Sequence, residues 1–316
     1  MPTISFSMRD LSNLIKKKLD KEKLLELLED AKAEIESIEG DEVTIKLNDT
    51  NLPYLCSVEG LARFFRGVLG KQNGIPKIKV KPSNYKILVD NSLKNIRPYL
   101  TAFIAKGKKI DDHFLKQLIQ LQEKISENYG RRRKKVSIGL YPSQKIKFPV
   151  YYKSVFPYAV KFIPLEFRKE LTLSRILQEH PKGEEYAWIL KDCKKYPLLI
   201  DSKKDVLSFP PIINSATTGR LEVGDDELMF EATGDDLDAL NLATNIFAYA
   251  LYERGFEIHS VAVKFKNKTI KTPTLKTSSI KIKKEQITNL LGLDIKDSEV
   301  KKLVEKAGYE FKKYTI

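Results

Sequence analysis

Hydrophobic positions in the first 80 residues recur first at helical and then at strand spacing. After Asp20, a good N-cap residue, apolar positions follow a helical period at Leu24, Leu25, Leu27, Leu28, Ala31 and Ile35. Apolar and polar residues then alternate over residues 43–47, as in a half-buried strand. A second helix is predicted from the Ser57 cap to Gly67 or Gly70. Together these elements predict a small α+β unit.

The middle of the chain mixes short strands with two longer helices. The pattern predicts strands at 85–89, in several short runs over 135–165, at 197–201, 205–208 and 228–233, and helices from Asp111 or Asp112 to Gly130 and from Asp235 or Asp236 to Gly255. The strands on either side of the polar turn 202–204 form a predicted hairpin. A larger mixed α/β domain follows from this pattern.

The last residues predict a further, incomplete piece. Residues 280–316 read as one strand, two short helices and a final strand. A segment of about 40 residues is near the lower limit for an independent core, so we expect the natural chain to continue past Ile316. The predicted fold class is therefore α+β, with a small N-terminal α+β domain at 1–82, a larger mixed α/β domain at 83–270 and a truncated C-terminal α/β piece at 271–316.

The composition is that of a globular protein without a membrane segment. Hydrophobic residues make up 42% of the 316 positions, too many for a disordered chain. No apolar run approaches the roughly 20 residues that cross a bilayer, and the N-terminus lacks a signal-peptide pattern. We therefore expect a cytoplasmic protein. Two distant cysteines and three scattered histidines favour neither a disulfide framework, nor a metal site, nor a histidine-centred triad.

The net charge of +14 is unevenly spread. Five consecutive cations occupy residues 131–135, and such a cluster attracts polyanions. In contrast, residues 222–238 hold eight acidic side chains and no Lys or Arg, which would repel phosphate. The pattern indicates a basic approach surface beside a separate acidic feature. Both are equally well explained as solvated faces of a Lys- and Glu-rich, heat-adapted protein.

Familiar catalytic motifs are absent from the sequence, but short polar positions stand at strand ends. There is no phosphate loop, dinucleotide fingerprint, GxSxG elbow or HExxH motif. Two prolines at 210–211 prevent strand pairing after Ser208 and leave neighbouring side chains available for a pocket. Strand alternation places Glu231 and Thr233 on one face, where a carboxylate and a hydroxyl can bind one ligand group. The pattern alone favours a simpler interpretation, a helix cap at Thr233 and a solvated Glu231.

Two further features lie near the basic cluster. Gln122, on the helix before it, could hold a base edge while Arg133 holds a phosphate, although exposed helix positions are the commoner outcome. The single tryptophan, Trp188, and the pair Tyr151 and Tyr152 are expected in the core, because aromatic residues at strand spacing are usually buried.

Several separate motifs, in order along the whole chain, resemble the beta subunit of archaeal and eukaryotic-type phenylalanyl-tRNA synthetase. The matching segments are 119–124, 130–133, 196–201, 208–215, 218–220 and 231–234. The resemblance implies that residues 1–316 are the N-terminal portion of such a subunit and that 83–270 are an editing domain that binds tRNA. Relatives often carry Asp where this chain has Glu231.

By this resemblance, the chain hydrolyses tyrosine wrongly esterified to phenylalanine tRNA, which is post-transfer editing within a phenylalanine–tRNA ligase. The implied editing pocket is Leu199, Ser208, Glu231 and Thr233, and the implied contacts of the tRNA 3′ end are Gln122, Glu123, Arg133, Asn214 and Arg220. No side chain is assigned as a nucleophile and no metal ligand is expected. A positioned water is expected to attack the ester.

The resemblance also implies partners. These are tRNA(Phe) and an alpha subunit that carries the aminoacylation site, in a heterotetramer of two alpha and two beta subunits. No cofactor is expected in this portion, whereas ATP and Mg²⁺ serve the holoenzyme. The alternative function is a non-hydrolytic scaffold that binds tRNA and assembles the synthetase.

Overall fold

The computed structural model describes residues 1–49 and 51–316. The chain divides into two compact units, Met1–Ile78 with Leu275–Ile316, and Lys79–Thr274. Both contain helices and strands, which confirms the α+β class. The unit boundaries fall at 78/79 and 274/275, against 82/83 and 270/271 from the sequence. Residues 275–316 group with the N-terminal residues instead of forming a unit of their own.

The first unit is built on a three-stranded antiparallel sheet in the order β1-β3-β2. Its elements in chain order are β1 (Thr3–Ser7), α1 (Met8–Ile15), α2 (Lys21–Asp30), β2 (Ala33–Glu39), β3 (Glu42–Leu47) and α3 (Val58–Val68). The predicted strand at 43–47 and the helix capped by Ser57 are confirmed. The helix after Asp20 ends earlier than predicted, because Lys32 takes a left-handed φ of 51° and Ile35 then lies in β2.

The C-terminal part of this unit holds two helices, α8 (Lys284–Leu291) and α9 (Asp297–Lys306). The strands predicted on either side of them are reduced to isolated bridges, one of which joins Lys281 to Thr315. Among the described residues 275–316, Val300 is the only buried one. So little buried apolar surface cannot support a sheet of its own.

The second unit contains an eleven-stranded mixed sheet within the described residues. The main strand order is β13-β12-β11-β8-β5-β15-β6-β14-β7, and β4 and β16 pair with β15. The strands are β4 (Val80–Lys81), β5 (Lys86–Val89), β6 (Tyr99–Lys106), β7 (Val136–Pro142), β8 (Val150–Val155), β11 (Tyr196–Ile200), β12 (Val206–Phe209), β13 (Ile213–Asn214), β14 (Glu227–Gly234), β15 (Glu257–Lys264) and β16 (Thr269–Thr272). The predicted hairpin is the antiparallel pair β11–β12.

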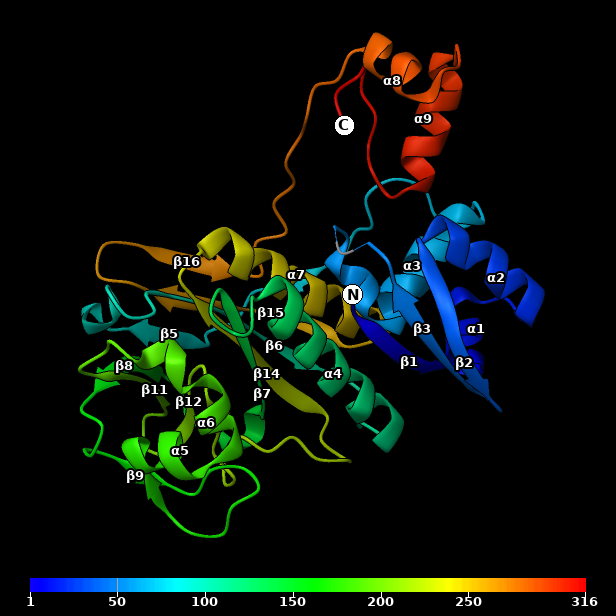
Figure 1. Ribbon diagram of the computed structural model, residues 1–316. Coiled ribbons are helices and arrows are strands. Elements are labelled where there is room, and N and C mark those ends of the chain that lie inside the picture. Colours follow the sequence, from blue (N-terminus) through cyan, green and yellow to red (C-terminus); the bar gives the residue numbers. More distant parts are fainter. Residues whose placement is uncertain (50) are drawn as a thin grey trace. The chain divides into compact units, whose positions relative to one another are not determined.

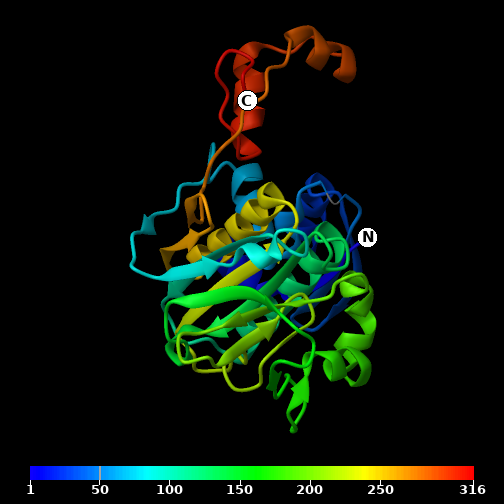
Figure 2. The ribbon, with the colours of Figure 1, turned by 90° about the vertical axis from the view of Figure 1, so that its left-hand side faces the viewer.

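Helix α7 (Leu237–Glu253) lies across one face of this sheet, on β6, β14 and β15 (Figure 1). The helix packs on the sheet through aromatic rings. The ring centroid of Phe230 on β14 lies 4.9 Å from that of Phe103 and 4.8 Å from that of Phe247 on the helix. Figure 2 shows the same helix, in yellow, above the strands. Because side chains alternate along β14, the neighbours of Phe230 point to the opposite face. That face carries the candidate site.

A second apolar cluster covers the β11–β12 end of the sheet. It packs the short pair β9 (Lys161–Phe162) and β10 (Leu171–Thr172) with α5 (Leu173–Glu179) and α6 (Pro181–Tyr186). Of the aromatic residues expected in the core, Tyr152 is fully buried, but Tyr151 is 37% exposed and Trp188 is 43% exposed. The exposure of Tyr151 follows from strand alternation, because Tyr151 is next to Tyr152 on β8 and its side chain points to the opposite face.

Helix α4 (Asp112–Lys124) continues as one π-helical stretch, Ile125–Tyr129, to Gly130. The predicted end at Gly130 is confirmed, but its conformation is right-handed, with φ of −74°. Gly130 is needed for close approach instead, because a Cβ there would lie 2.3 Å from the carbonyl oxygen of Val136. The three arginines that follow, residues 131–133, adopt the left-handed conformation instead.

The cap of α7 gives a direct test of local stability. Asp236 accepts hydrogen bonds from the amides of Asp238 and Ala239 and pairs with Lys135 at 3.0 Å. We expect Asp236→Ala to lower the free energy of unfolding by about 1 kcal/mol, because the helix loses its N-cap. Asp236→Asn should retain most of that stability, since the amide oxygen still caps. Urea unfolding of the three proteins measures the difference, and equal losses in both variants would contradict the capping role.

Candidate functional site

A cavity of about 320 Å³ opens in the second unit between α4, the strands β7 and β14, and the segment 208–221. This volume lies within the roughly 300–1,000 Å³ of small-molecule sites. The predicted site residues that line it are Gln122, Arg133, Ser208, Asn214, Arg220 and Glu231. Residues from five separate chain segments thus meet at one cavity.

Three predicted residues do not line this cavity. Glu123 is exposed on α4, because neighbouring helix positions point about 100° apart and Gln122 takes the inward direction. Leu199 is fully buried in the core beside Ser208, its partner in the β11–β12 pairing. Thr233 is fully buried one position beyond the cavity wall. Leu199 and Thr233 are therefore buried beside lining residues and do not reach the cavity.

Glu231 is the buried acid of the site. It is 2% exposed, and its Oε2 has no hydrogen-bond partner among residues 1–49 and 51–316. Burial raises the pKa of Glu231 to about 7, while a hydrogen bond from Tyr141 and the charge of Arg97 act in the lowering direction. A buried carboxylate oxygen without a partner is costly, so the cavity presents a site that requires a hydrogen-bond donor.

Tyr141 connects Glu231 to the other side of the cavity. Its phenol oxygen lies 2.8 Å from Oε1 of Glu231 on β14 and 2.9 Å from Oγ of Ser208 on β12. The side chain passes over Gly139, which is paired directly with Glu231. A Cβ at Gly139 would lie 2.2 Å from the Tyr141 hydroxyl. The glycine therefore provides the space through which Tyr141 reaches Glu231.

The single proton of each hydroxyl fixes what the cavity offers to a ligand. When Glu231 is ionised it only accepts, so the one proton of Tyr141 goes to Glu231, and Tyr141 can then bond to Ser208 only as an acceptor. What remains on the cavity side is Oε2 of Glu231 and a lone pair of Ser208. Both are acceptors. This part of the cavity therefore offers acceptors to a ligand group that donates, such as a hydroxyl.

Arg97 supports this arrangement from the interior. The side chain is 3% exposed, and its Nε donates to Oγ1 of Thr233 at 2.9 Å. Nη2 donates to Oγ of Ser137 at 3.1 Å and also to the carbonyl oxygen of Thr233. Burial lowers the pKa of Arg97, and the charge of Glu231 opposes this. The hydrogen bonds of Thr233 thus go to the buried guanidinium and to Ser137.

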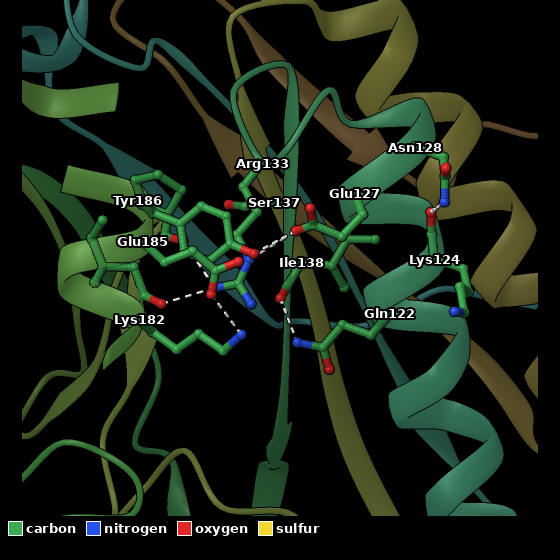
Figure 3. Close-up of polar contacts among 12 residues, drawn as sticks. Gln122, Lys124, Glu127, Asn128, Arg133, Ser137, Ile138, Lys182, Glu185 and Tyr186 are labelled. Carbon is green, nitrogen blue, oxygen red and sulfur yellow. Dashed lines mark hydrogen bonds and ion pairs between the residues drawn. The ribbon is translucent and has the colours of Figure 1, made fainter. Parts of the chain in front are cut away.

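Three of the lining side chains hold the wall together, two of them drawn in Figure 3. Gln122 donates to the carbonyl oxygen of Ile138 at 2.9 Å. The Nη1 of Arg133 donates to the carbonyl oxygen of Ile212 at 2.9 Å and lies 3.3 Å from that of Pro211. Asn214 donates to the carbonyl oxygens of Gly219 and Leu140. These contacts fix the proline segment against β7, so Gln122 and Arg133 have structural partners where the sequence predicted a base edge and a phosphate.

The remaining predicted residue, Arg220, is exposed at the cavity rim. In the described part of the chain, no histidine, cysteine or lysine lines the cavity. The same residues contain no group of three or more side chains suited to hold a metal ion. Nor does any described helix have the length and apolarity needed to cross a membrane. The polar chemistry of the cavity thus comes from carboxylate, hydroxyl, amide and guanidinium groups.

Sequence reasoning missed Tyr141, Arg97 and Ser137. A glycine inside a strand signals close approach of another group, so Gly139 two residues before Tyr141 could have indicated that contact. Arg97 lies between an apolar residue and a proline, and nothing in that pattern distinguishes a buried guanidinium from an exposed one.

The chain is similar over nearly its whole length to known proteins. The phenylalanine–tRNA ligase beta subunit of Pyrococcus horikoshii is 43% identical over 314 residues, which cover 98% of this chain and 56% of that protein. The beta subunit of Methanosphaera stadtmanae is 36% identical over 310 residues, or 98% of this chain and 55% of that one. No family model matches the chain.

A solved structure decides the family. The N-terminal fragment of the phenylalanyl-tRNA synthetase beta subunit from Pyrococcus horikoshii superposes with a TM-score of 0.94 at 41% identity, over 99% of this chain and 92% of the fragment. The chain belongs to the phenylalanine–tRNA ligase beta-subunit family. The resemblance noted in the sequence is thereby confirmed. The chain spans about half the length of the curated beta subunits it matches.

The buried acid of this beta-subunit chain makes its stability depend on pH. The pKa of Glu231 rises from 4.5 to about 7 on folding. Between these values the folded chain binds more protons than the unfolded chain, so stability falls by roughly 3 kcal/mol as pH rises from about 4.5 to 7 and then levels off. We expect Glu231→Gln to lose this contribution, whereas exposed Glu123→Gln should keep it. Urea unfolding at pH 5 and pH 8 measures it, and identical pH dependence in all three proteins would contradict the burial of a titrating acid.

Proposed function

We propose that this chain carries the post-transfer editing activity of a phenylalanine–tRNA ligase, the hydrolysis of tyrosyl-tRNA(Phe). One observation carries the proposal. Glu231 lines the cavity, and its buried Oε2 has no hydrogen-bond partner among the described residues. A tyrosyl group brings a phenol proton to that oxygen, and a phenylalanyl group brings none.

Discrimination then follows from hydrogen bonding and not from size. A synthetic site that admits phenylalanine excludes tyrosine incompletely, and a second site can select by the hydroxyl that phenylalanine lacks. Phenylalanine bound in this cavity would leave Oε2 of Glu231 buried without a hydrogen bond, at about 1–3 kcal/mol for each unsatisfied group. The phenylalanyl ester therefore escapes hydrolysis, while the tyrosyl ester is bound in the cavity and hydrolysed.

The reaction itself requires water and no covalent enzyme intermediate. The hydroxyl of a bound water adds to the ester carbonyl carbon, the bond from that carbon to the ribose oxygen breaks, and the ribose oxygen receives the proton. We assign assistance to the neighbouring ribose hydroxyl of the terminal nucleotide and to backbone amides that stabilise the developing oxyanion. Without a lining histidine or cysteine among the described residues, the pocket offers no activated nucleophile.

The wider assembly is part of the same proposal. The tRNA would approach over the basic run at 131–135 and over Arg220 at the rim. The ligase would consist of two alpha and two beta subunits in the cytoplasm. Aminoacylation, with its ATP and Mg²⁺, belongs in this proposal to the alpha subunit.

The central test compares two preformed esters. We expect the chain to hydrolyse tyrosyl-tRNA(Phe) faster than phenylalanyl-tRNA(Phe), and Glu231→Ala to reduce this ratio about 10- to 100-fold, since the phenol loses its acceptor. Glu231→Asp should keep part of the ratio. Glu123→Ala, exposed on α4, is the matched control and should leave it unchanged.

Single-turnover hydrolysis rates give the ratio directly. If the wild-type chain hydrolyses neither ester, the result would favour the non-hydrolytic scaffold. A tyrosyl adduct on the protein, detected by mass spectrometry, would refute the direct attack of water.

A second variant tests the hydrogen-bond direction. Tyr141→Phe removes the bond that lowers the pKa of Glu231. We expect the pH at which tyrosyl selectivity appears to move upward from about 7, because a protonated Glu231 is a poorer acceptor for the phenol. Tyr151→Phe, at an exposed tyrosine, is the control. Selectivity measured against pH in the three proteins decides the matter, and an unmoved midpoint in Tyr141→Phe would contradict this role.

A further inference from the structure

The basic run beside the cavity contains a strained turn. Arg131, Arg132 and Arg133 have φ values of 52°, 52° and 63°, all in the left-handed region. The left-handed conformation is unfavourable for any residue that carries a side chain, so each of the three positions is strained. Such strain concentrates at functional sites. Three consecutive strained residues, all arginines, therefore call for a functional explanation.

Buried contacts hold the turn in place. Nη1 of Arg97 donates to the carbonyl oxygen of Lys134 at 2.9 Å, and Nη2 donates to that of Arg133 at 3.0 Å. The amides of the three arginines donate to the carbonyl oxygens of the preceding π-helical stretch, at 2.9–3.1 Å. The turn is thus a fixed part of the site, attached through Arg97 to the strand that carries Glu231 and Thr233.

The turn places two successive arginines over two aromatic rings. The guanidinium of Arg133 lies 4.1 Å from the ring centroid of Tyr186, and that of Arg132 lies 5.9 Å from that of Trp188. Figure 3 shows Arg133 and Tyr186 together, with the tyrosine hydroxyl directed to Glu127. That pair is closed, because Tyr186 is 1% exposed. The other pair is open, since Arg132 is exposed and Trp188 is 43% exposed.

The chemistry of the open pair identifies the kind of partner it fits. A nucleobase stacks on an indole ring irrespective of its sequence, and adjacent arginines bind phosphate and stack as cations. Arg132 lies within five consecutive cations, and the next residue, Arg133, lines the cavity. A folded protein partner would not require five consecutive cations next to an open aromatic ring. An unpaired stretch of polynucleotide has both the flat rings and the phosphates.

We propose that Arg132 and Trp188 form a stacking platform for an unpaired nucleotide of the RNA whose acylated end enters the cavity. The base stacks on the indole of Trp188, and its phosphate pairs with Arg132. The identity of the RNA rests on the proposed function, whereas the platform itself rests on the strained turn and the open ring.

The chain offers a direct spectroscopic probe, because Trp188 is its only tryptophan. We expect a single-stranded RNA octanucleotide to quench the tryptophan emission of the 316-residue chain in a saturable way, and added salt to reverse the quenching. For the two variants that lack this fluorophore, affinity is measured by the anisotropy of a dye-labelled octanucleotide. Trp188→Ala should weaken binding roughly 5- to 150-fold, and Trp188→Phe should recover most of it, since both variants leave the buried pair intact.

The arginine is tested through salt dependence. Arg132→Ala should weaken binding and reduce the slope of log affinity against log salt by about one. Arg175→Ala, an exposed cation of α5, is the matched control and should leave both unchanged. Circular dichroism of each variant confirms that it is folded.

The outcomes separate this proposal from the editing function. Absence of octanucleotide binding at low salt, binding without a change in Trp188 emission, or unchanged affinity in Trp188→Ala would overturn the platform. Quenching by a wild-type chain that hydrolyses neither ester would support the platform and contradict editing. Hydrolysis of the tyrosyl ester without any effect of Trp188→Ala on RNA affinity would leave editing in place and refute the platform.

Discussion

The arrangement of the second unit depends on the hydrogen bonds that Tyr141 makes to Glu231 and Ser208. These two partners lie on β14 and β12, near opposite ends of the strand order, so one phenol joins parts of the sheet that do not pair with each other. The same bonds decide which polar atoms are left for a ligand. One side chain therefore both links the two strands and determines which polar atoms face the cavity, so the lining residues alone do not describe the site.

The cations of the chain serve three different purposes. Arg97 is buried and binds carbonyl and hydroxyl oxygens, Arg133 is half-buried and fixes the proline segment, and Arg132 is exposed over an aromatic ring. The sequence shows them only as basic residues. Likewise the acidic segment 222–238 includes a helix cap at Asp236, an ion pair at Glu227 and the buried Glu231. Net charge alone describes none of these roles.

Periodicity predicted the elements well where one face is buried and the ends carry caps, as for α3 and the β11–β12 hairpin. It failed where a non-glycine residue turns left-handed, as at Lys32, and where too little apolar surface is available, as after residue 275. Of the nine site residues named from the motifs, six line the cavity. They could not reveal Arg97 or Tyr141, because burial of a polar side chain depends on partners distant in sequence, nor the exposure of Trp188.

The space above Gly139 has a consequence for how this family can vary. The Tyr141 ring lies where any side chain at position 139 would have to go, so the two positions are one unit of substitution. A lineage that replaces the glycine must also shorten or remove the aromatic residue, and must then find another group to occupy Oε1 of Glu231. Aligned beta subunits should therefore show correlated changes at 139, 141 and 231, and a relative with an aspartate at 231 is where a rearranged pair would first be sought.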